Sequence, residues 1–267
     1  MIVVGELINA SRKKMGEAIR TKDAGYIGKI AQEQRDAGAD YIDVNAGIFV
    51  EEEPDYLKWL VKVVQEATQA PCSIDSPNPK AIMASLEVHR EDMAPMLNSI
   101  SLEQARYKAL LPIVAGTNMK IVALCMSDEG MPETAKQRLE IAEKLINSLT
   151  KENVPIGNIY VDPLVQPVST NQRFGIEFLN AVKEIMEEFP GVHTMCGLSN
   201  ISFGLPNRMY LNRMFAVMAI ANGLDGLIVN PLDRQMMTNL TAAQTLAGRD
   251  KFCMQYLTAH RQGRFDP

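Results

Sequence analysis

The chain has 267 residues, a formal net charge of −5 and a hydrophobic content of 46%. This acidic balance lacks the basic face expected of a protein that binds nucleic acid or an anionic membrane. No apolar run approaches the ~18 residues that a membrane-spanning helix needs. The first residues, MIVVGELINASRKK, have no basic region ahead of their short apolar run, unlike a signal peptide. We therefore expect a cytoplasmic protein without a nucleic-acid or membrane partner.

The residues that most often bind metals are few and scattered. The four cysteines and three histidines are Cys72, Cys125, Cys196, Cys253, His89, His193 and His260. They form no CxxC pair and no HExxH motif, so we predict no protein-built metal site. Without such pairing, the cysteines are expected to be reduced thiols, buried as small apolar residues.

Short apolar runs rich in β-branched residues recur along the whole chain. They cover 2–7, 41–47, 72–76, 94–99, 120–126, 159–164, 193–199 and 224–230. Most intervals between them are long enough for a helix and two loops. Apolar character on both faces is typical of parallel strands that are covered by helices.

Helical periodicity fills several of these intervals. Apolar residues recur at helical spacing in 55–67, 176–189 and 211–221, and Gly223 stands where a helix would end. Eight strand–helix units predict a single (β/α)8 TIM barrel over 1–267, with strands in about 2–230 and a final helix and tail in 231–267. A doubly wound open sheet is the alternative. The methionines of the predicted helix near 211–221, Met209, Met214 and Met218, are expected in the core.

Polar residues stand where the predicted strands end. They are Glu6, Asn9, Asp43, Asn45, Asp75, Ser76, Asn98, Ser99, Asp162, Ser199, Asn200, Asn230 and Asp233. In a parallel barrel these ends converge on the active site. Carboxylates and amides can bind the edge of a neutral, nitrogen-rich heterocycle. With no His, Lys or Cys among them, nucleophilic catalysis by the protein is not expected.

Some of these polar residues have a simpler structural explanation. Ser76 or Asn78 can cap the helix that follows, and Ser11 can cap the first helix. The acidic run 51–53 and the basic run 12–14 are expected to be solvated. Asp75 and Asp162 differ, because each directly follows apolar residues and a buried carboxylate needs a partner or a ligand. There is no GxGxxG or GxxxxGK[ST] motif to hold a nucleotide phosphate.

Seven segments, taken in order, resemble one known family. They are GELIN (5–9), GADYIDVNAG (38–47), SIDS (73–76), MLNS (96–99), YVDPL (160–164), GLSNIS (197–202) and NRMYLNRMF (207–215). They resemble the pterin-binding methyltransferases, which move a methyl group between tetrahydrofolate and a corrinoid protein. The resemblance implies a barrel like that of dihydropteroate synthase and of the folate domain of cobalamin-dependent methionine synthase.

The resemblance also implies roles for individual residues. Asp75, Asn98 and Asp162 would bind the aminopyrimidine edge of the pterin. Gly197 and Ser199 would lie against the ring, and Asn200 would reach N5, the atom that gains or loses the methyl group. By the same resemblance, Arg208 would hold the far part of the folate. Asp43 and Asn45 would lie behind the ligand-contacting residues or form the floor, and Glu6 and Asn9 remain as polar residues of the first strand. Leu7 departs from the family's usual GER or GEN, so a polar role at that position is not expected.

The resemblance implies tetrahydrofolate or 5-methyltetrahydrofolate as substrate, and a homodimer. The DxHxxG signature of cobalamin domains is missing, so the corrinoid (cobalamin) is expected on a separate protein that docks transiently at the barrel mouth. The direction of transfer is open, with demethylation slightly favoured. Dihydropteroate synthase, a zinc-dependent homocysteine methyltransferase and a non-catalytic pterin-binding subunit are the alternatives. Dihydropteroate synthase would need a lysine at the seventh strand, and GLSNIS has none. The zinc-dependent homocysteine methyltransferase would need clustered thiolates, which this sequence lacks.

Overall fold

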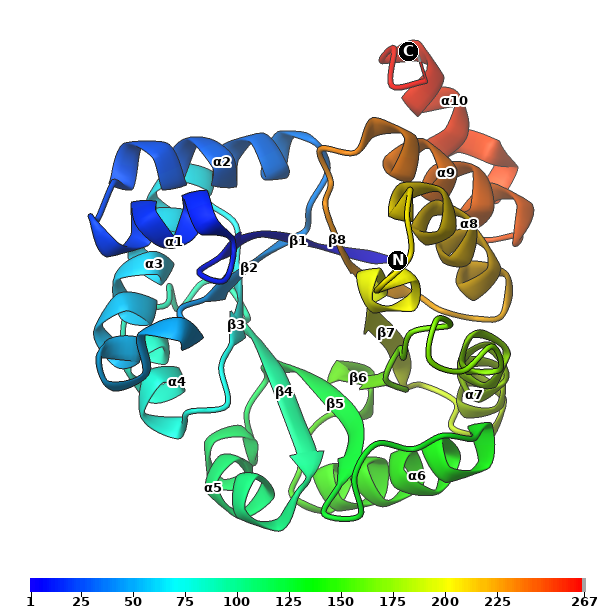
Figure 1. The fold of residues 1–267 in the computed structure, drawn as a ribbon, viewed down its shortest axis with the longest axis horizontal. Coiled ribbons are helices and arrows are strands. Elements are labelled where there is room, and N and C mark those ends of the chain that lie inside the picture. The colour runs from blue at the N-terminus through cyan, green and yellow to red at the C-terminus, as the bar shows by residue number, and fades with distance from the viewer. Residues whose placement is uncertain (266–267) are drawn as a thin grey trace.

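The computed structural model describes residues 1–265 as one closed barrel of eight parallel strands in chain order (Figure 1). The strands are β1 (Ile2–Asn9), β2 (Tyr41–Asn45), β3 (Cys72–Asp75), β4 (Met96–Leu102), β5 (Lys120–Ser127), β6 (Ile159–Asp162), β7 (His193–Gly197) and β8 (Gly226–Val229). Because β1 pairs with β8, the sheet closes on itself. The predicted TIM barrel is confirmed and the open sheet is excluded.

Helices form a ring outside the strands (Figure 1). The α-helices are α1 (Lys13–Arg20), α2 (Ala24–Asp36), α3 (Glu53–Thr68), α4 (Pro79–Leu86), α5 (Gln104–Val114), α6 (Ala135–Lys151), α7 (Phe174–Glu188), α8 (Arg208–Ala221), α9 (Arg234–Leu246) and α10 (Met254–Arg261). Short 3-10 helices are η1 (Gly47–Glu52), η2 (Ile156–Asn158), η3 (Leu198–Ser202) and η4 (Lys251–Cys253). The three helices expected from periodicity are α3, α7 and α8. Within residues 1–265, none of the helices combines the length with the apolar content that a membrane span requires.

The loops that follow β1 and β3 differ partly from expectation. Asn78 caps α4 by accepting the backbone N–H of Lys80 at 3.0 Å. Ser11 does not cap α1, because its N–H and hydroxyl both donate to Asn9 Oδ1. Ser76 donates to Glu53 Oε1 at 2.6 Å. Glu53 is itself buried, so the prediction that the whole acidic run is solvated was wrong at this residue.

An apolar plug fills the amino-terminal end of the barrel. Its buried side chains are Val4, Tyr41, Met96, Val122, Tyr160 and Met195. Side chains two positions apart in a strand share one face. Each of several strands therefore presents a polar or open position directly above its plug residue: Glu6, Asp43, Asn98, Asp162 and Gly197. The plug thus forms the base on which the polar site rests.

Two expectations about the core were wrong. Cys253 is exposed, whereas the other three cysteines are buried. Met209, Met214 and Met218 have exposed fractions of 58%, 57% and 49%. Helix α8 has two apolar faces, and the face with Phe215, Ala216, Ala219 and Ile220 packs inward. The outer face carries Tyr210, Leu211, Met214 and Met218, which we call the α8 stripe.

Candidate functional site

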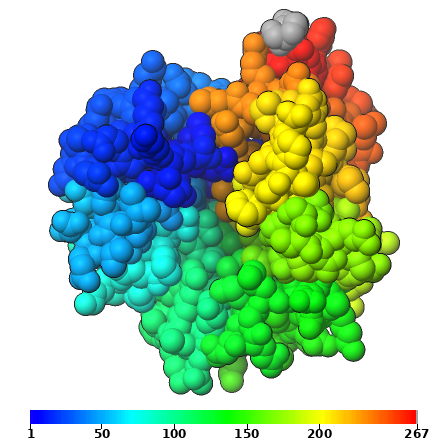
Figure 2. All heavy atoms as spheres, in the orientation of Figure 1, coloured from blue at the N-terminus to red at the C-terminus, as the bar shows by residue number. Residues whose placement is uncertain are grey.

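The carboxyl ends of the strands surround a hollow in the barrel face shown in Figure 2. Asp75 ends β3, Asp162 ends β6 and Gly197 ends β7. Asn98 lies in β4, in register with Asp75 on the neighbouring strand. The fold therefore brings these four sequence-predicted residues to one end of the barrel, the end where TIM barrels carry their active sites.

Asp75 is held by the neighbouring strand. Asn45 Nδ2 donates to Asp75 Oδ2 at 2.9 Å and to the Asp75 carbonyl oxygen at 3.2 Å. Burial raises the pKa of the Asp75 carboxyl, while the Asn45 amide and the nearby Arg106 guanidinium oppose the shift. Asn45 thus orients a carboxylate that keeps acceptor capacity for a ligand.

Asp43 lies one step deeper and is 4% exposed. Its Oδ1 accepts the Ser73 hydroxyl at 2.7 Å and Asn98 Nδ2 at 3.2 Å. Burial, and then the negative charge of Asp75, raise the pKa of Asp43 well above its usual range. Asp43 therefore supports Asn98 from below. Asn45 supports Asp75 from the side.

Asp162 is 8% exposed at the end of β6. Its Oδ1 accepts the backbone N–H of Leu164 at 2.8 Å. Burial raises the pKa of Asp162 to about 7, although hydrogen bonds from the Leu164 and Gly197 backbone oppose the rise. Near neutral pH this carboxyl can serve either as a hydrogen-bond donor or as an acceptor. Both roles suit the edge of a heterocycle that carries N–H groups as well as nitrogen lone pairs.

The wall beside Asp162 is open at Gly197. A Cβ atom added there would meet no protein atom within 4 Å. A flat ring can therefore lie directly against the backbone. Ser199 and Asn200 follow in η3, where Ser199 is half-buried and Asn200 is exposed.

Arg208 begins α8 and turns back onto η3. Its Nε donates to the Ser202 hydroxyl at 3.0 Å and its Nη2 to the Ser199 carbonyl oxygen. In this conformation Arg208 fixes the loop that bears Asn200.

The polar residues of β1 are engaged locally. Glu6 pairs with Arg12 at 2.6 Å, and burial raises the pKa of Glu6 against the effect of that guanidinium. Asn9 accepts from Ser11 in a tight turn. Leu7 donates its backbone N–H to Gln34. Glu6 also lines a cavity of about 200 Å³ at the same end of the barrel; the other lining residues include Ser199, Asn212, Asn230 and Asp233.

Two arginines beside the site were not anticipated from the sequence: Arg106 is half-buried and Arg138 is fully buried. Arg106 Nη2 donates to the Ser99 carbonyl oxygen at 2.8 Å, and its Nε is buried without a partner in the described residues. Arg138 is fully buried, and its Nε donates to the Pro163 carbonyl oxygen at 2.7 Å. It thereby holds the backbone that follows Asp162. The Arg138 contact spans 25 residues, so no local pattern indicates it.

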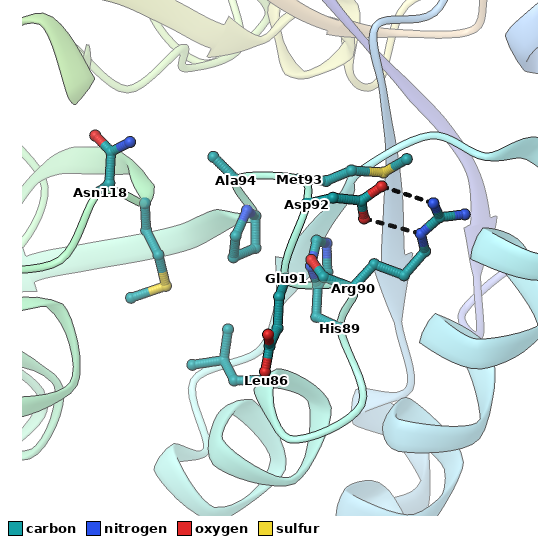
Figure 3. Close-up of a pocket in the computed structure, with 10 residues that line it drawn as sticks. Leu86, His89, Arg90, Glu91, Asp92, Met93, Ala94 and Asn118 are labelled. Atoms are coloured by element: carbon teal, nitrogen blue, oxygen red, sulfur yellow. Dashed lines mark hydrogen bonds and ion pairs between the residues drawn. The ribbon is translucent and has the colours of Figure 1, made fainter.

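A second cavity, of about 480 Å³, lies at the opposite end of the barrel (Figure 3). It is lined by the segment between α4 and β4, where Arg90 pairs with Asp92 at 2.7 Å, and by Asn118 before β5. The buried His89 accepts the Cys72 N–H at 3.2 Å and therefore serves the packing of β3. Because residues at the amino ends of TIM-barrel strands serve stability, we do not assign the reaction to this cavity.

The mouth offers buried carboxylates, amides and an open backbone position, which are groups that can bind a flat, nitrogen-rich ring by its edge. The chain belongs to the family of pterin-binding enzymes, which matches residues 5–230. This assignment confirms the resemblance predicted from the sequence motifs.

Individual relatives agree with the family. The chain is 35% identical over 269 residues to a methylcorrinoid:tetrahydrofolate methyltransferase of Eubacterium limosum, covering all of this chain and 98% of that protein. It is 32% identical to methionine synthase of Mycobacterium tuberculosis over 86% of this chain but only 20% of that protein. Dihydropteroate synthase from Xanthomonas albilineans, solved with 7,8-dihydropteroate, shares the fold with a TM-score of 0.71 and 17% identity, covering 92% of this chain and 93% of that one.

Proposed function

We propose that this enzyme transfers a methyl group between the cobalt of a methylcorrinoid protein and N5 of tetrahydrofolate. The observation that carries the proposal is the full-length similarity to a methylcorrinoid:tetrahydrofolate methyltransferase. The mouth supports it, because it offers buried carboxylates, amides and an open backbone at Gly197. The name of that relative gives the order corrinoid to folate, and we propose the same direction here.

The chemistry matches the side chains that are present. In this direction the methyl–cobalt bond breaks with its electron pair left on cobalt, a bond forms between the methyl carbon and N5, and the N5 proton leaves. The protein then has to hold N5 in line with the methyl group and stabilise the charge that develops there. Asp75, Asn98 and Asp162 would bind the pterin edge, and the exposed amide of Asn200 would hydrogen-bond N5.

The corrinoid would arrive on a separate protein. The plug closes the amino end of the barrel, so we propose docking over the carboxyl-terminal mouth. Such docking would be transient, because the cobalt must also collect its methyl group elsewhere.

An anaerobic spectral assay tests the proposal. Methylcobalamin and tetrahydrofolate are mixed with the protein, and loss of methylcobalamin with formation of Co(I) is followed. We expect turnover that falls by ~100-fold in Asn200→Ala, the usual loss when one positioned donor is removed, while tetrahydrofolate binding persists. The matched control is Asn147→Ala, which removes an exposed amide on α6.

The outcomes separate the alternatives. Tight tetrahydrofolate binding without turnover, even with a methylcorrinoid protein, would support a non-catalytic pterin-binding subunit. Formation of dihydropteroate from a pterin pyrophosphate and aminobenzoate would instead support a dihydropteroate synthase. Absence of pterin binding would refute the proposal.

We also propose a homodimer formed through the α8 stripe. Its side chains Tyr210, Leu211 and Met214 are 69%, 41% and 57% exposed on one helix face, and large exposed apolar patches commonly mark interfaces. We expect twice the 29.6 kDa chain mass by light scattering, and a monomer after Met214→Asp. Met83→Asp, at a 56% exposed position on α4, is the matched control. A monomeric wild-type protein would contradict this assignment.

A further inference from the structure

Asp43 is a buried polar residue of the barrel interior to which neither the proposed chemistry nor the ligand edge assigns a direct role. It lies between the apolar plug and the ligand-facing residues: Tyr41 precedes it in β2 by two positions and Asn45 follows it by two. At 4% exposed, it is too deep to be a surface group. Its hydrogen bonds therefore indicate what it does.

The contact between Asp43 and Asn98 determines how the Asn98 amide is turned. Oxygen Oδ1 of Asp43 accepts Asn98 Nδ2 at 3.2 Å and the Ser73 hydroxyl at 2.7 Å. The two hydrogen bonds tie the side chain of Asp43, which belongs to β2, to residues of β3 and β4. With its NH2 group held by Asp43, Asn98 must direct its carbonyl oxygen to the other side.

That other side is the barrel mouth. Asn98 is half-buried, and within residues 1–265 its Oδ1 has no hydrogen-bond partner and is not sealed from solvent. Asn98 therefore offers a ligand a hydrogen-bond acceptor and not a donor. An amide free to turn could offer either group, because its two ends have nearly the same shape.

We propose that Asp43 is a positioning residue that holds Asn98 as an acceptor and thereby makes the site selective for reduced pterins. The inference rests on the proposed function, because it assumes that a bound pterin lies with its N8 facing Asn98 Oδ1. Tetrahydrofolate and 7,8-dihydrofolate carry a hydrogen on N8, next to the aminopyrimidine ring, whereas fully oxidised folic acid carries only a lone pair there. Facing Asn98 Oδ1, that lone pair would leave two acceptors opposed and unpaired, which is costly.

Wild-type protein gives the first test. Dissociation constants for tetrahydrofolate, 7,8-dihydrofolate and folic acid are measured anaerobically by calorimetry. We expect similar values for the two reduced ligands and binding of folic acid weaker by roughly ten- to hundredfold, the effect of one unmade buried hydrogen bond. Equal affinity for dihydrofolate and folic acid would overturn the proposal.

Two substitutions test the role of Asp43 itself. Asp43→Asn keeps an oxygen that can accept from Asn98 and Ser73, so we expect it to retain the preference for reduced ligands. Asp43→Ala releases the Asn98 amide. The ratio of the dissociation constant for folic acid to that for dihydrofolate should then fall towards one. Full selectivity in Asp43→Ala, or equal loss in both variants, would contradict the assignment. Thermal unfolding checks that each variant folds, and if Asp43→Ala does not, the three-ligand comparison decides.

Ligand binding by wild-type protein and by Asp43→Ala distinguishes a wrong function from a wrong role for Asp43. If wild-type protein binds none of the three ligands, the proposed function is wrong and this inference falls with it. If it binds both reduced ligands but Asp43→Ala leaves the ratio unchanged, only the role of Asp43 is wrong.

Discussion

Replacement of Asp162 by Asn should stabilise the ligand-free protein, and more strongly as the pH rises. Burial raises the pKa of this carboxyl to about 7, whereas an Asp in an unfolded chain titrates near ~3.9. Between these values the folded protein keeps a proton that the unfolded chain has lost. The folded state binds more protons in this window, so the Asp162 contribution to stability falls as the pH rises through it.

The size of the effect follows from the two pKa values. One pH unit corresponds to ~1.36 kcal/mol, so an ionised Asp162 lowers the free energy of unfolding by up to ~4 kcal/mol above pH ~7. The amide introduced by Asp162→Asn has no charge to bury, and its oxygen can still accept the Leu164 N–H. The stability difference should therefore grow from pH ~4 to pH ~7 and then remain constant.

Urea denaturation of both proteins from about pH 4.5 to about pH 8.5 measures this difference. The matched control is Glu188→Gln, the same carboxylate-to-amide change at an exposed position on α7. A difference that stays constant with pH, or that shrinks as the pH rises, would show that Asp162 is not protonated in the folded protein. It would also remove the argument that this residue can act as a donor.

Three further substitutions test other parts of the site. Gly197→Val should weaken tetrahydrofolate binding by at least about tenfold while thermal stability stays unchanged. The reason is that the valine side chain would occupy the open space in which we expect the pterin ring. Unchanged affinity in calorimetry would argue against ring stacking at Gly197. Arg138→Ala should lower the free energy of unfolding by about 3 kcal/mol, because two carbonyl oxygens lose their buried donor; urea denaturation without a loss would refute this. Glu53→Ala should cost ~1–3 kcal/mol in the same assay, because Ser76 and Asn78 lose their acceptor, and an unchanged midpoint would contradict the assigned contact.

The strands and the general location of the site could be predicted because both depend on local patterns. Parallel strands need apolar residues on both faces, and the residues at their carboxyl ends converge in any closed barrel. Asp75 and Asp162 were recognised because each interrupts an apolar run. Asn98, by contrast, gains its orientation from Asp43, 55 residues away.

Features that depend on distant partners could not be predicted. The acidic run 51–53 gives no sign that Glu53 differs from its neighbours, since its partners Ser76 and Asn78 follow more than 20 residues later. The helical period of α8 identifies a helix but not which of its two apolar faces turns inward. The burial of Arg138 likewise depends on carbonyl oxygens from another loop.

The plug at the amino end of the barrel also has a kinetic consequence. Because Tyr41, Met96, Tyr160 and the other plug residues are buried against one another in the described chain, we expect both reactants of the proposed reaction to use the carboxyl-terminal opening. Tetrahydrofolate reaches to the floor of the site, and the corrinoid protein covers the entrance. We therefore expect a compulsory order in which the folate enters first and leaves last, so that an excess of the corrinoid partner slows the cycle by trapping the finished product beneath it.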